Sequence, residues 1–62
     1  MTKTYEEMIE KLGRELRWMW ENPERTKDYH SYRLSGEALM LADIFGKDLD
    51  EVNDDIRTAA KR

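Results

Sequence analysis

The feature that most constrains the fold is the run LSGEALMLADIFG, residues 34–46, in which apolar residues outnumber charged ones. At about 100° per residue, Leu39, Met40 and Ile44 spread over much of the circumference of a helix formed by this run. The densest apolar side of that helix is made by Leu34, Ala38, Leu41, Ala42 and Phe45. A helix that is apolar on so many sides needs cover from more than one neighbour. We therefore predict a central helix against which the flanking segments fold.

An amphipathic helix is predicted over residues 5–21. Thr4-Tyr5-Glu6-Glu7 has the form of a capping box, in which Thr4 and Glu7 satisfy free backbone N–H groups at the helix start. Apolar residues then recur at spacings of three and four, namely Tyr5, Met8, Ile9, Leu12, Leu16, Met19 and Trp20. Gly13 lies on the same face, and because a mid-helix glycine costs about 1 kcal/mol relative to alanine, we expect another helix to approach closely there. Asn22-Pro23 ends the helix.

Two further helices are predicted, over residues 31–45 and 49–60. The start of the first is open between Asp28 and Ser35, whereas its end is marked by Gly46, which can adopt the left-handed conformation that closes a helix. Asp48 and Glu51 have capping-box spacing for the last helix. The pattern contains no strand alternation, and it predicts a single all-α, three-helix domain over residues 1–62.

The length and the cysteine and histidine counts limit the kinds of site that we expect. A chain of 62 residues buries a small core, so that it relies on good helix packing or on oligomerisation. The sequence has no cysteine and one histidine, and we therefore expect no disulfide, no metal site and no cofactor. It has no long apolar run, and its first residues lack the apolar stretch of a secretory signal, so we expect a cytoplasmic protein that binds no membrane.

The charge is unevenly placed along the chain. The formal net charge is −3; residues 1–33 carry seven Lys/Arg and seven Asp/Glu, whereas residues 34–62 carry four and seven. Nucleic-acid affinity rests largely on neutralising phosphates with Lys and Arg. From this balance we do not expect binding to nucleic acid.

Trp18 heads the candidate binding residues, because it lies about 180° round the first helix from Ile9, among charged residues. It is either a partner or dimer contact, as tryptophan often is at interfaces, or part of a small cluster under residues 24–32, against Tyr29. A basic and aromatic group surrounds it in sequence. The predicted partner-binding residues are Arg14, Arg17, Trp18, Tyr29, Tyr32, Arg33 and Met40.

A second candidate is an acidic surface in the last third of the chain. It comprises Asp48, Asp50, Glu51, Asp54 and Asp55. These carboxylates either complement the N-terminal dipole of the last helix and stay solvated, or dock on a basic surface of a partner. Calcium is rejected, because Asn53 and Ala59 hold the positions at which a calcium loop needs glycine and glutamate.

Residues 41–52, LADIFGKDLDEV, resemble the closing helix, turn and helix start of Cro/repressor-type helix-turn-helix domains. The S-Q-x-x-L-A block that precedes this segment in that family is absent here. The resemblance therefore implies the local helix, turn and helix start. It implies no function for the chain.

The leading functional hypothesis is a small non-enzymatic protein-binding module, an adaptor or inhibitor of a larger protein, encoded by a phage or another mobile element. No nucleophile turn, phosphate loop or dinucleotide motif occurs, so we expect no enzyme activity. The alternative hypothesis is a small dimeric DNA-binding transcriptional regulator that uses the basic middle of the chain. A lesser alternative is a self-associating structural protein in which the central helix supplies the dimer face.

Overall fold

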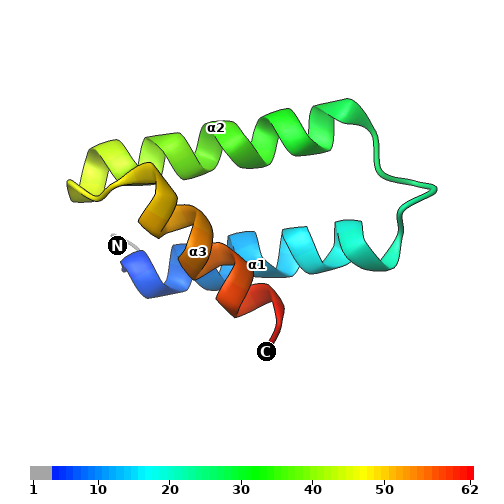
Figure 1. Ribbon diagram of the computed structural model, residues 1–62, viewed down its shortest axis with the longest axis horizontal. Helices are drawn as coiled ribbons and strands as arrows, with labels where there is room; N and C mark the ends of the chain where they lie inside the picture. The colour runs from blue at the N-terminus through cyan, green and yellow to red at the C-terminus, as the bar shows by residue number, and fades with distance from the viewer. Residues whose placement is uncertain (1–3) are drawn as a thin grey trace.

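The computed structural model describes residues 4–62, which form three helices, α1 (Tyr5–Glu21), α2 (Asp28–Phe45) and α3 (Leu49–Ala60). α1 and α2 form a hairpin, and α3 crosses it near the end at which α1 begins and α2 finishes (Figure 1). Most contacts of α3 are with α1. The prediction of a small all-α domain of three helices is confirmed.

The predicted ends of α1 are confirmed in atomic detail. The Glu7 N–H donates to Thr4 Oγ1 at 3.1 Å, and the Thr4 N–H donates to Glu7 Oε1 at 3.4 Å, which completes the capping box. At the other end, the backbone N–H and the side-chain amide of Asn22 both donate to the Trp18 carbonyl oxygen at 2.9 Å. Asn22 therefore satisfies the last turn and lets the chain leave before Pro23.

α2 begins at Asp28, earlier than the predicted start at residue 31. The Lys27 N–H donates to His30 Nδ1 at 2.9 Å, so the imidazole satisfies a backbone donor at the helix start. Histidine is not one of the residue types that favour such a cap, and the pattern therefore did not indicate it. Just before it, the Thr26 hydroxyl donates to the carbonyl oxygens of Met19 at 3.2 Å and Asn22 at 2.9 Å, which folds the connector onto the end of α1.

The turn between α2 and α3 is closed by Gly46, which has φ 63° as predicted. The capping box predicted from Asp48 and Glu51 is wrong, because the Asp48 side chain makes no capping hydrogen bond. The Glu51 carboxylate instead accepts from Lys47 Nζ at 3.2 Å. Lys47 also lies over the Tyr5 ring, 4.6 Å from its centroid. The Glu51 carboxylate, which the predicted capping box would use, is therefore paired with Lys47 from the turn.

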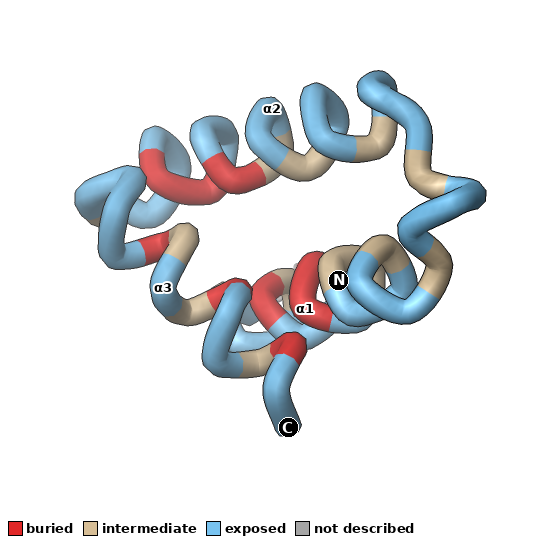
Figure 2. The backbone as a smooth tube through the Cα atoms, turned by 45° about the vertical axis from the view of Figure 1, so that its right-hand side comes forward, coloured by how far each residue is buried: buried red, intermediate tan, exposed pale blue. Residues whose placement is uncertain are grey.

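The core lies where the three helices meet. Leu41 and Val52 are its largest fully buried side chains. The buried apolar residues of the described chain are Ile9, Leu12, Ala38, Leu41, Ala42, Val52, Ile56 and Ala60. Figure 2 shows the buried positions on the sides of the helices that face one another, and all of them except Ala60 belong to one packed cluster. Phe45, predicted with this set, closes the edge of the core against the Tyr5 ring, at 5.3 Å between centroids, and stays partly exposed.

α1 and α3 approach each other closely at Gly13, as the position of this glycine on the apolar face indicated. A Cβ placed on Gly13 would lie 2.7 Å from the Ala59 Cβ and 3.1 Å from backbone atoms of residues 59 and 60. These atoms are the Cβ of Ala59 and backbone atoms of α3, so they could move away from such a Cβ only if α3 itself moved. The glycine is therefore required by packing between helices.

The two mid-helix glycines should respond oppositely to alanine. Gly13→Ala gains about 1 kcal/mol of helix propensity but forces α3 outward, which typically costs about 1–3 kcal/mol, so we expect a net loss of stability. A Cβ on Gly36 meets nothing within 4 Å, so Gly36→Ala should raise the stability of the single chain by about 1 kcal/mol. Urea unfolding of dilute protein measures both changes. A stabilised Gly13→Ala variant would contradict the close approach of α1 and α3.

Tyr5 links the start of α1 to α3 through a hydrogen bond. Its hydroxyl donates to Asp55 Oδ2 at 2.7 Å. Partial burial, this hydrogen bond and the negative charges of Asp55 and Glu51 raise the pKa of Tyr5 well above its usual value of 10.0. The neutral phenol is the form that the fold requires.

The raised pKa of Tyr5 predicts a loss of stability at alkaline pH. Because the phenol ionises more readily in the unfolded chain, its contribution is fully present below pH 10.0 and is lost as the pH rises above that value. Tyr5→Phe should therefore be less stable than the parent chain at neutral pH but lose less stability between about pH 10 and pH 11. Urea unfolding at several pH values compares the two slopes; equal slopes would contradict the prediction.

Candidate protein-binding surface

The side of α2 that is turned away from α1 and α3 carries an exposed apolar surface, which we call the outer α2 face. Its residues are Tyr29, Tyr32, Gly36, Leu39, Met40 and Ile44. Leu39, Met40 and Ile44 expose 58%, 60% and 62% of their surfaces. Figure 2 shows this side of α2 as exposed along the helix. The apolar positions that the sequence marked as needing a neighbour therefore keep more than half of their surfaces exposed.

The connector between α1 and α2 does not fold back over this face. Residues 22–27 lie at the end of the molecule where α2 begins, whereas Ile44 lies one residue before the far end of α2 (Figure 1). Hydrogen bonds from the Thr26 hydroxyl to the carbonyl oxygens of Met19 and Asn22 hold the connector against the end of α1 instead. The connector therefore leaves Leu39, Met40 and Ile44 exposed.

Trp18 belongs to a row of aromatic rings that joins α1 to α2. Its ring lies 5.4 Å from the His30 ring, centroid to centroid, and His30 in turn stacks on Tyr29 at 4.2 Å. Trp18 is still 40% exposed. The cluster predicted under residues 24–32 therefore exists, with His30 between Trp18 and Tyr29, and it leaves one side of the indole at the surface.

A shallow pocket of about 210 Å³ opens beside this row of rings. Met19 and Leu34 form its apolar part, and Glu15 and Arg33 form its polar edge. Sites for small organic ligands usually measure about 300–1,000 Å³. The pocket is better matched to a single side chain of a protein partner than to a whole small molecule.

The predicted arginines do not gather into one basic surface. Arg33 donates to Glu15 at 2.9 Å and to Glu37 at 3.3 Å. Arg17 turns toward the chain terminus, where it donates to the Arg62 carbonyl oxygen at 2.9 Å and to Glu21 at 3.4 Å. Arg14 is exposed on α1, at the edge of a groove that Ala59 and Arg62 also line. Carboxylates of the chain itself thus occupy two of the three guanidinium groups.

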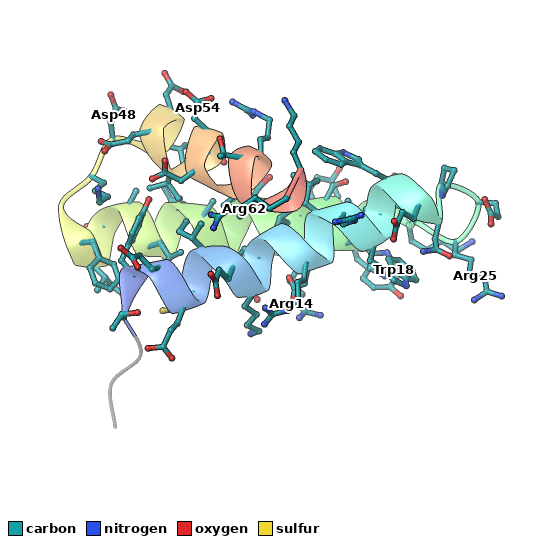
Figure 3. All side chains as sticks on the ribbon, turned by 90° about the horizontal axis from the view of Figure 1, so that it is seen from below. Arg14, Trp18, Arg25, Asp48, Asp54 and Arg62 are labelled. Atoms are coloured by element: carbon teal, nitrogen blue, oxygen red, sulfur yellow. The ribbon has the colours of Figure 1, made fainter. Side chains whose placement is uncertain are left out.

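Three of the five predicted acidic residues are paired with other side chains of this chain. Asp55 accepts from Tyr5, Glu51 accepts from Lys47, and Asp54 accepts from Arg57. Asp48 and Asp50 are exposed. In Figure 3, Asp48 and Asp54 lie on the opposite side of the molecule from Trp18 and Arg14. The predicted acidic and aromatic surfaces are therefore separate.

Sequence reasoning left four residues out of the candidate site. Leu39 and Ile44 complete the outer α2 face, and Gly36 lies in its centre. The glycine in the middle of the predicted helix was a signal that could have identified Gly36. Trp20 is 48% exposed, although its spacing placed it on the core side of α1. Trp20 instead lines the rim of a groove beside Ile56 and Arg57 of α3, which cover only part of the indole.

The described residues contain neither a group of side chains suited to a metal ion nor a helix suited to a membrane. In residues 4–62, no three His, Asp or Glu side chains are grouped so that they could hold a metal ion. Within the same range, no helix has both the length and the apolar character needed to cross a membrane. Comparisons with known protein families, with curated proteins and with solved structures find no match.

Trp18→Ala should leave the fold intact, because the indole lies outside the buried core. We expect a loss of roughly 1 kcal/mol from the contact with His30, compared with about 2–5 kcal/mol for Leu41→Ala in the core. Circular dichroism during thermal unfolding measures both variants. Loss of the helical signal in Trp18→Ala at room temperature would show that Trp18 belongs to the core.

Proposed function

We propose that this chain is a non-enzymatic protein-binding module of the cytoplasm, of the adaptor or inhibitor type, and that the outer α2 face is its docking surface. The observation that supports this function is the exposure of Leu39, Met40 and Ile44 on one side of a single helix. Contiguous apolar patches on small soluble domains commonly mark interaction sites. An apolar helix face also fits a common mode of protein recognition, in which side chains spaced by three and four residues anchor the contact.

The surroundings of the face favour a protein over a nucleic acid. Arg33, the arginine nearest to it, is held by Glu15 and Glu37. Asp43 lies on the same side of α2 between the apolar residues and is exposed. A phosphate backbone would meet this carboxylate without a compensating cluster of cations. A partner with apolar side chains and a hydrogen-bond donor for Asp43 fits the surface better.

A matched pair of lysine substitutions tests the docking surface. Leu39→Lys and Thr58→Lys each add one positive charge at an exposed helical position, and neither should change the helical circular dichroism. Leu39→Lys places an ammonium in the apolar contact, so we expect it to lower partner capture from host extract by roughly tenfold, with Thr58→Lys as the control. Quantitative mass spectrometry measures the captured proteins. Equal capture by both variants and the parent chain would contradict the proposed function.

A further inference from the structure

We propose that the start of α2 is a pH-sensitive switch, in which protonation of His30 releases the first helical turn and separates the row of rings formed by Trp18, His30 and Tyr29. The switch is a property of the folded chain alone, so it does not depend on a partner at the outer α2 face. His30 is the single histidine of the sequence. Imidazole is the side chain whose ordinary change of charge falls between pH 5 and pH 8.

The hydrogen bond at the start of α2 requires a neutral imidazole. The Lys27 N–H donates to His30 Nδ1 at 2.9 Å, so Nδ1 carries a lone pair and the proton of the neutral ring is on Nε2. His30 occupies the third helical position, where a capping box usually has a glutamate or glutamine that accepts this bond. An imidazole loses the acceptor when a proton binds Nδ1, whereas a glutamate keeps it at neutral and mildly acidic pH.

Protonation of His30 opposes the observed geometry in two ways. The new Nδ1–H would point at the Lys27 N–H, so that a donor faces a donor. The first turn of α2 also carries the positive end of the helix dipole, which disfavours a cation. Rotation of the imidazole away from Lys27 relieves both effects, and the first turn then loses its side-chain cap. The cap therefore stabilises the helix start at neutral pH and is lost as the pH falls.

The charged groups around His30 leave this preference in place. Glu15 of α1 and Arg33 of α2 line the same pocket as His30, and they pair with each other at 2.9 Å. Lys27 of the connector and Asp28 of α2 are its charged neighbours along the chain. These four groups are two cations and two anions. The hydrogen bond to Lys27 and the helix dipole therefore decide which form of the imidazole the helix start favours.

The first turn of α2 depends on such local interactions because the core does not hold it. None of residues 28–31 is buried, and the buried residues of α2 begin at Ala38. α3 crosses the hairpin near the opposite end of α2 (Figure 1). Loss of one cap should therefore open this turn without unfolding the three-helix core.

Rotation of His30 also separates the row of rings. Its imidazole lies between the other two rings, 4.2 Å from the Tyr29 ring and 5.4 Å from the Trp18 ring, centroid to centroid. His30 and Trp18 both line the pocket of about 210 Å³. Protonation therefore changes the shape and the charge of this pocket, and a contact with Trp18 or Tyr29 becomes dependent on pH.

Two-dimensional NMR of the labelled chain at about pH 7.5 and about pH 5 tests the switch, because ordinary carboxylates stay largely ionised over this range. At the higher pH, the imidazole ¹⁵N shifts should show the proton on Nε2. At the lower pH, the ¹³Cα shifts of residues 28–31 should move toward random-coil values. The population with an open first turn should rise about fivefold, the effect of losing a typical side-chain cap. The indole signal of Trp18 should titrate with His30, whereas that of Trp20 should not.

His30→Gln is the matched variant, because glutamine keeps an acceptor at this position and binds no proton. Its ¹³Cα shifts over residues 28–31 should be the same at both pH values. Three results would overturn the switch: parent ¹³Cα shifts that stay unchanged while His30 takes up its proton, equal movement of these shifts in His30→Gln, or a neutral imidazole with its proton on Nδ1.

Discussion

The close approach of α1 and α3 at Gly13 is the contact on which the rest of the structure depends. It fixes α3 across the first half of α1, with Ala59 at the glycine and the chain terminus beside Arg17. From that position α3 covers one side of α2 with Val52 and Ile56. The position of α3 thus determines which apolar residues are buried in the small core and which stay exposed.

The uncovered part is mostly on α2, the longest and most apolar helix. α1 and α3 are amphipathic and turn their charged sides to solvent, whereas α2 is apolar on both its inner side and its outer side. Two short helices can cover only the inner side. The exposure of Leu39, Met40 and Ile44 is therefore a consequence of the architecture.

Local patterns predicted what local interactions determine. The spacing of apolar residues predicted the helices, and Thr4 and Glu7 predicted the start of α1. Gly46 predicted the end of α2, and Gly13 predicted the close approach of another helix to α1. Interactions between distant segments decided the rest. Glu51 pairs with Lys47 instead of capping α3.

The candidate site shows the same division. The sequence placed Trp18 off the core side and identified Met40 and its neighbours as needing cover, because both follow from helix periodicity. It could not show that Arg33 is held by Glu15, a residue eighteen positions away, nor that Trp20 remains half exposed beside α3. Those facts depend on the angle at which the helices cross, and no single-helix pattern contains it.

The most direct test of the central claim, that the outer α2 face is where this fold meets its partner, is two-dimensional ¹H–¹⁵N NMR of the labelled chain before and after addition of the protein that it captures from host extract. Docking on the outer α2 face predicts shifts in the amide signals of residues 29–44, with the exposed side of α3 around Asp50 and Asp54 unchanged. Shifts that lie chiefly on α3 would contradict it.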